Sequence, residues 1–91
     1  MFYHVEMTVN LPPDMPKENA DAIKLEEKLY AQDLMRAGKW LHIWRLVGEY
    51  ANVSIFDVAD HDELHDLLSG LPLFPYMQIR VRALARHPSA L

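Results

Sequence analysis

One glutamate stands where the sequence otherwise places apolar side chains. Glu27 lies four residues after Ile23 and three before Tyr30, so the three side chains share one face of a helix. Burying an unpaired carboxylate is costly, and Glu27 therefore needs an explanation. It could form a buried salt bridge, or its side chain could bend out to solvent. It could also be desolvated in a pocket, which would raise its pKa and make it a stronger general base.

Four further side chains could complete a pocket around such a base. Tyr50 and Asn52 alternate along one predicted strand and share a face, so they would offer a hydroxyl and an amide together. Ordinary cross-strand packing with polar ends is the alternative for this pair. Arg45 and Lys24 could each bind a substrate carboxylate, Arg45 in a bidentate manner. Lys24 lies one turn before Glu27 and could instead pair with it.

Other kinds of catalytic site find little support in the sequence. His61 and His65 have a spacing that can bind a metal ion, but two ligands alone are more typical of solvated side chains. The chain has no cysteine, which excludes disulfides, thiolate zinc sites and cysteine nucleophiles. Its three glycines do not cluster into a phosphate-binding loop, and no serine lies in a nucleophile elbow. The residues therefore favour an ordinary carboxylate as the catalyst.

Six elements must position these side chains. Apolar residues recur with period two in four segments and with helical spacing in two others. Asp14 is the predicted N-cap of the first helix, with Pro16 in its first turn, and Gly38 is its stop signal. Asp60 and Glu63 have the spacing of a capping box at the second helix. In chain order we predict a strand over 2–11, a helix over 17–37, strands over 40–47 and 50–58, a helix over 60–70 and a strand over 76–84.

This order of elements, β-α-β-β-α-β, predicts an α+β fold of the ferredoxin-like type, with an antiparallel sheet and both helices on one face. The length of 91 residues predicts a single domain, spanning 1–91. A chain of this size buries only about two-thirds of the surface that its unfolded form exposes. Because the helices leave one sheet face open, we expect that face to pair with a second copy of the chain.

Charge and hydropathy exclude several classes of partner. Thirteen acidic residues against nine basic ones give a net charge of −4, which argues against binding nucleic acid through its phosphates. No uncharged apolar run approaches the roughly 20 residues that span a membrane, and the first residues do not resemble a signal peptide. The absence of cysteine fits a reducing cytoplasm. We therefore expect a cytoplasmic protein with neither nucleic-acid nor membrane partners.

Four sequence blocks, spread over essentially the whole chain, resemble the muconolactone isomerases. They are F-Y-H-V-E-M-T-V-N-L-P-P-D-M at the start, W-L-H-I-W-R-L-V-G-E-Y-A-N-V-S-I-F-D-V in the centre, L-H-D-L-L-S-G-L-P-L-F-P-Y-M, and R-H-P-S near the end. The resemblance implies conversion of (S)-muconolactone to 3-oxoadipate enol-lactone, in the catechol branch of the β-ketoadipate pathway. It implies no cofactor and no metal, and a dimeric α+β barrel assembled into decamers of five dimers.

The resemblance also assigns roles to the candidate residues. Glu27 would move the proton, and Tyr50 or Asn52 would stabilise the charged intermediate. Arg45 or Lys24 would hold the substrate carboxylate. The apolar wall would come from Trp44 and Phe74. Two alternatives remain open: the related chloromuconolactone dehalogenases, which share the proton abstraction and expel chloride, and a module that binds small ligands without catalysis.

Overall fold

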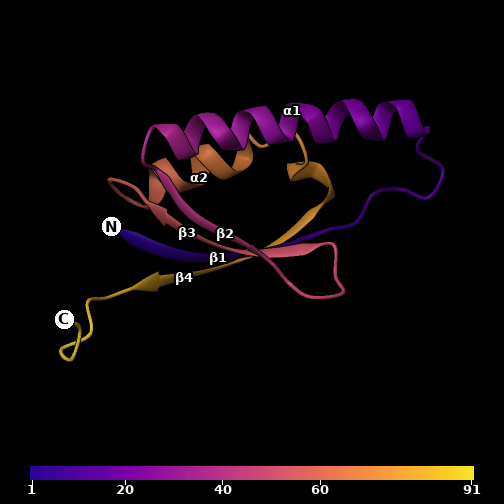
Figure 1. Ribbon diagram of the computed structural model, residues 1–91. Coiled ribbons are helices and arrows are strands. Elements are labelled where there is room, and N and C mark those ends of the chain that lie inside the picture. The colour runs from indigo at the N-terminus through magenta and orange to yellow at the C-terminus, as the bar shows by residue number, and fades with distance from the viewer.

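The computed structural model describes all 91 residues and has the expected element order (Figure 1). Four antiparallel strands form one sheet in the order β2-β3-β1-β4, and both long helices cover the same face of it. This confirms the predicted ferredoxin-like α+β class. The elements are β1 (Phe2–Val9), α1 (Lys17–Arg36), β2 (Trp40–Arg45), β3 (Ala51–Asp57), α2 (His61–Ser69), the short 3₁₀ helix η1 (Phe74–Tyr76) and β4 (Met77–Leu84).

The hydrophobic core lies between the sheet and the two helices. In β1, one of the two central strands, Tyr3, Val5 and Met7 are buried, whereas the residues between them point to the open face. This is the alternation that the sequence predicts. On neighbouring strands, Trp40 and Phe56 pack with ring centroids 4.6 Å apart, which closes the core beneath α1.

The inward face of α1 carries the predicted stripe, but the start of the helix differs from the prediction. Pro16, not Asp14, is the N-cap, and no side chain caps this end. The Pro16 carbonyl accepts hydrogen bonds from the amides of Asn19 and Ala20, so the first turn begins beyond the reach of Asp14. The stop signal is confirmed, because Gly38 follows the helix with a positive φ of 76°.

The hairpin of β2 and β3 contains a β-bulge that the residue pattern does not predict. Gly48 makes the turn with a φ of 81°, as expected for a glycine at this point. A bulge between Trp40 and His42 then shifts the register of β2. Beyond it Ile43 and Arg45 lie on the helix side with Trp40, whereas His42 and Trp44 pair with residues of the open face.

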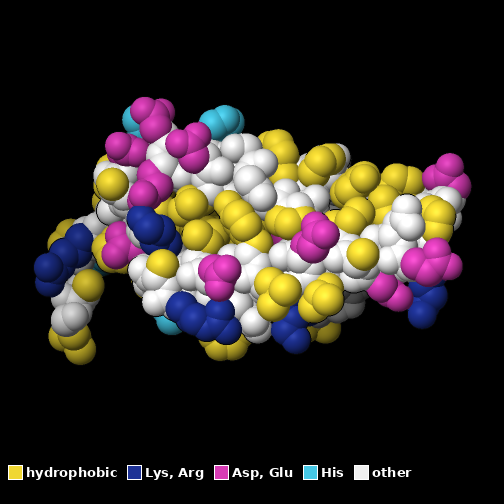
Figure 2. Space-filling model, turned by 90° about the horizontal axis from the view of Figure 1, so that it is seen from above, with side chains coloured by type: hydrophobic (Ala, Val, Ile, Leu, Met, Phe, Trp, Pro, Cys, Tyr) yellow, Lys and Arg dark blue, Asp and Glu magenta, His cyan; other side chains and the backbone are white.

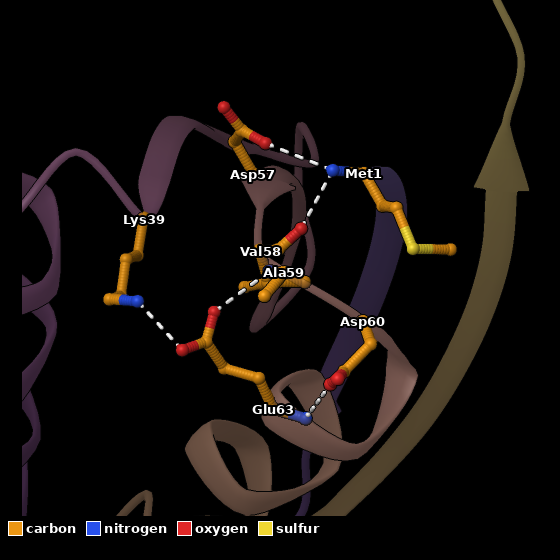
Figure 3. Close-up of polar contacts among 7 residues, drawn as sticks. All are labelled: Met1, Lys39, Asp57, Val58, Ala59, Asp60 and Glu63. Atoms are coloured by element: carbon orange, nitrogen blue, oxygen red, sulfur yellow. Dashed lines mark hydrogen bonds and ion pairs between the residues drawn. The ribbon is translucent and has the colours of Figure 1, made fainter.

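The start of α2 is capped by a variant of the predicted capping box (Figure 3). Asp60 is the N-cap, and its Oδ1 accepts a hydrogen bond of 2.8 Å from the Glu63 amide. The Glu63 carboxylate accepts from the Ala59 amide at 3.0 Å and from Lys39 Nζ at 2.7 Å. Glu63 therefore joins α2 to the residue that precedes β2.

A second group of contacts in Figure 3 holds the start of β1 against the end of β3. The Met1 nitrogen donates to the Val58 carbonyl at 2.7 Å and to Asp57 Oδ1 at 3.2 Å. In the view from above (Figure 2), hydrophobic side chains run along the middle of the molecule, acidic side chains lie at both ends, and histidine side chains lie among those at the upper left. No helix is both long and apolar enough to cross a membrane.

Candidate active site

An open cavity of about 810 Å³ lies between α1 and the sheet, chiefly over β2 and β3. Its volume falls within the range of small-molecule sites. Nine of its 15 lining residues are hydrophobic, so a few polar groups face one another across an apolar surface. Five of the seven predicted site residues line this cavity: Lys24, Glu27, Arg45, Tyr50 and Asn52.

Glu27 is half-buried on the helix side of the cavity, where the apolar stripe of α1 predicts it. Its Oε1 accepts a hydrogen bond of 2.9 Å from the Leu73 amide, and it takes part in none of the ion pairs of the structure. Burial raises the pKa of this carboxyl above its ordinary value of 4.5, and the Leu73 N–H partly opposes that rise. Glu27 is therefore a stronger base than an exposed glutamate, held in one orientation by a backbone donor.

Tyr50 lies at the cavity with a cation near its ring from each of two elements. Lys24 Nζ of α1 is 5.5 Å from the ring centroid, and Arg45 Cζ of β2 is 5.4 Å from it. Burial is the largest cause of a raised pKa of Tyr50; Arg45 opposes the rise and Glu27 adds to it. Its hydroxyl consequently keeps its proton at neutral pH and is a hydrogen-bond donor.

Asn52 owes its orientation to a buried serine that the sequence interpretation missed. Ser54 follows two residues later in β3, lies on the same sheet face and has no exposed surface. Its hydroxyl donates a hydrogen bond of 2.8 Å to Asn52 Oδ1. With its oxygen occupied, the Asn52 side chain has its NH₂ group left to donate into the cavity.

Trp44 and Phe74, the expected apolar wall, do not line the cavity. Trp44 is 69% exposed, because the β2 bulge exchanges the faces of the residues that follow it. Phe74 is 38% exposed, because η1 begins there and places its predecessor Leu73, not Phe74, at the cavity. The wall is made instead by other apolar residues, among them Trp40 and Ile43 of β2 and Leu73.

Two further groups at the cavity were not among the predicted site residues. The Leu73 amide that binds Glu27 belongs to the main chain, and any residue except proline would provide it. Lys28, one residue after Glu27, is exposed as its helical spacing predicts, and it also lines the open cavity as a third cation with Lys24 and Arg45. No group of three or more His, Asp or Glu side chains in the structure could hold a metal ion.

Comparison with known proteins identifies the family. The family model described as muconolactone delta-isomerase matches residues 1–90. The chain belongs to the muconolactone delta-isomerase family. Two similar members of that family are the muconolactone delta-isomerase of Cupriavidus pinatubonensis, 65% identical over 91 residues, and that of Rhodococcus opacus, 51% identical over 87. The alignments cover 100% and 96% of this chain, and 99% and 94% of those relatives.

A solved structure supports the same family assignment at the level of the fold. The crystal structure of a muconolactone isomerase superposes on the chain with a TM-score of 0.95 at 54% sequence identity. The superposition covers 100% of this chain and 95% of the other. The match to the muconolactone delta-isomerase family therefore extends over every element that lines the cavity.

Proposed function

We propose that this protein converts (S)-muconolactone to 3-oxoadipate enol-lactone, with Glu27 as the catalytic base. The observation that carries the proposal is a desolvated carboxylate, oriented by a backbone N–H, in a cavity lined also by the cations Lys24, Lys28 and Arg45. The family assignment supplies the reaction, and the cavity supplies groups suited to it.

The reaction moves a carbon–carbon double bond within a five-membered lactone. Glu27 removes the proton from the ring carbon that bears the carboxymethyl arm, and charge spreads through the conjugated system to the lactone carbonyl oxygen. The resulting furan-like dienolate then takes the same proton back at the carbon next to the carbonyl. Atoms and charge balance without a cofactor, because one carboxylate serves both steps on one face of the ring. General acid–base help of this kind contributes about 10²–10⁴-fold.

The dienolate oxygen requires hydrogen-bond donors, and Tyr50 and Asn52 supply them on the sheet side of the cavity. The Tyr50 hydroxyl is protonated at neutral pH, as tyrosine ordinarily is, and burial raises its pKa further. The Asn52 amide is oriented by Ser54, so its NH₂ group needs little reorganisation when charge develops. Glu27 on the helix side and these donors on the sheet side would therefore face opposite parts of the ring.

The substrate carboxylate requires a cation, since the protein as a whole carries a net charge of −4. Lys24 and Arg45 both stand beside the Tyr50 ring at the cavity, one on the helix and one on the sheet. Arg45 is the better candidate, because its guanidinium can bind a carboxylate through two parallel hydrogen bonds. Lys24→Gln and Arg45→Gln will show how much each cation contributes to substrate binding. The variant with the larger rise in KM identifies the residue that binds the carboxylate.

The proposed assembly is a dimer-based oligomer, most simply five dimers. The open sheet face supports it, because Phe2 is 49%, Leu84 43% and Trp44 69% exposed there in a single chain. Native mass spectrometry tests it against the 10.6 kDa of one chain. A monomer at micromolar concentration would refute it.

The proposed location is the cytoplasm, and the proposed pathway is catechol degradation. The cysteine-free composition agrees with a reducing cytoplasm. Cell fractionation would test the location, and growth on catechol would test the pathway.

The test of the function is ultraviolet absorbance of purified (S)-muconolactone at catalytic enzyme levels. We expect steady conversion by the wild type, a loss of about 10²–10⁴-fold in Glu27→Gln, and wild-type rates in Glu26→Gln, an exposed neighbour on α1. Near-normal turnover by Glu27→Gln would remove the proposed base. Activity confined to chlorinated muconolactone, with chloride release, would favour the dehalogenase, and no turnover of either would favour a binding module.

A further inference from the structure

Helix α1 binds the last turns of α2 and the segment that follows α2, through two side chains one helical turn apart. The hydroxyl of Tyr30 donates a hydrogen bond of 2.8 Å to the Leu67 carbonyl, and Glu27 accepts one of 2.9 Å from the Leu73 amide. Tyr30 follows Glu27 by three residues, so both side chains project from the same face of the helix. Tyr30 is the donor in the first hydrogen bond, and Glu27 is the acceptor in the second.

Gly70 fits the first of these contacts closely. A Cβ atom at residue 70 would lie 2.6 Å from the Tyr30 hydroxyl oxygen and 3.3 Å from Cζ of the same ring. The φ of Gly70 is −83°, which any residue can adopt, so its backbone conformation does not require glycine. The residue is therefore small because the Tyr30 hydroxyl occupies the space that a side chain would take.

The chain between the two contacts is short and well anchored. Leu71 and Leu73 are 2% and 4% exposed, and Pro72 between them has a restricted φ. The Leu71 amide donates to the Leu68 carbonyl at 3.1 Å, which continues α2 toward the cavity. A displacement of the end of α2 would therefore be passed to the Leu73 amide, because buried Leu71 and the restricted backbone of Pro72 lie directly before it.

We propose that Tyr30 and Gly70 are positioning residues for the base: together they fix the end of α2 so that the Leu73 N–H meets the Glu27 carboxylate. This inference rests on the proposed role of Glu27. The hydrogen bond favours the charged carboxylate and opposes the effect of burial. Tyr30 and Gly70 thereby govern both the place of the base and the pH at which it becomes active.

The pH dependence of kcat/KM tests the inference, because its fall at low pH reports the pKa of the base in the free enzyme. In Tyr30→Phe and in Gly70→Ala we expect that fall to move to higher pH, since the bond that favours the carboxylate is weakened. We also expect kcat at its plateau to drop by up to about 10²-fold, the loss typical of a 1 Å misplacement. Ser69→Ala is the matched control: its hydroxyl binds the His65 carbonyl at the same helix end, without contacting α1.

The double variant adds a test that loss of stability alone cannot imitate. Tyr30→Phe removes the oxygen that would lie 2.6 Å from an alanine Cβ at residue 70 and leaves contacts of 3.3 Å, so Gly70→Ala should cost much less activity in the Tyr30→Phe background than in the wild type. Multiplied losses, or a pH profile unmoved in both single variants, would overturn the inference.

Replacement of the Leu73 amide by an ester, through the α-hydroxy analogue of leucine, tests the donor directly and does not depend on how Gly70→Ala folds. We expect the same shift of the pH profile, and its absence would also overturn the inference. Glu27→Gln separates the two proposals. If it keeps full turnover, the proposed base fails. If it is inactive while the Tyr30, Gly70 and ester variants keep the wild-type profile, only the positioning roles fail.

Discussion

Shortening the side chain of Glu27, the proposed base, by one methylene group tests its reach while keeping its charge. Glu27→Asp withdraws the carboxylate by about 1.5 Å, one carbon–carbon bond. The oxygen now 2.9 Å from the Leu73 nitrogen would then lie about 4 Å away, beyond hydrogen-bond distance. The carboxylate would also retreat from the lactone by a similar amount. Both changes act on the proton transfer, whereas the cations and the apolar wall stay in place.

We expect kcat of Glu27→Asp to fall by about 10²-fold, equivalent to about 2.7 kcal/mol of transition-state stabilisation, with KM changed by only a few-fold. Steady-state kinetics with (S)-muconolactone, followed by ultraviolet absorbance, measure both constants, and circular dichroism checks the fold. A kcat within about threefold of the wild type would refute the reasoning, because catalysis would then not depend on where α1 places the carboxylate. A loss confined to KM would refute it as well, since it would give Glu27 a binding role.

Three further outcomes follow from individual contacts. Ser54→Ala should lower kcat by about 10-fold, because the one hydrogen bond of the Ser54 hydroxyl orients Asn52. The free energy of unfolding should change by less than about 1 kcal/mol. Strong destabilisation with unchanged kcat would contradict this prediction. Glu27→Gln should raise the melting temperature at pH 7, and the gain should shrink toward acid pH, because the raised pKa means that the ionised carboxylate opposes folding; equal melting temperatures at every pH would contradict it. Glu63→Gln should be less stable than the wild type at neutral pH, because the hydrogen bond from Lys39 is the main cause of the lowered pKa of Glu63. The difference in stability should vanish as the pH falls below 4.5 through that lowered pKa. A difference in thermal unfolding that persists at pH 2 would contradict this prediction.

The sequence predicted those parts of the molecule that depend on side-chain periodicity. Period-two and helical spacing located all four strands and both helices, with ends displaced by one to two residues. The same periodicity placed Glu27 on the inward face of α1, because a carboxylate within an apolar stripe is conspicuous whatever the tertiary structure. Tyr50, just before β3, and Asn52, two residues later, both line the cavity, as their spacing predicts.

The sequence did not reveal features that depend on the backbone itself. The bulge after Trp40 carries no residue signature, and it decides that Arg45 faces the cavity while Trp44 faces away. The first turn of α1 likewise forms at Pro16 because the proline carbonyl is available there, although Asp14 is the stronger capping residue by type. The donor to Glu27 is a main-chain N–H, and because every residue except proline has one, no residue type indicates it.

Leu73 contributes to the cavity in two separate ways, through its main chain and through its side chain. Because residue 73 contributes its amide to Glu27 and its side chain to the cavity wall, the two contributions can vary separately. Substitution of Leu73 by another apolar residue would reshape the space offered to the substrate, and the hydrogen bond to the base would persist for any residue except proline. The shape of the cavity can thus change at residue 73 while the contact that orients the proposed base is kept.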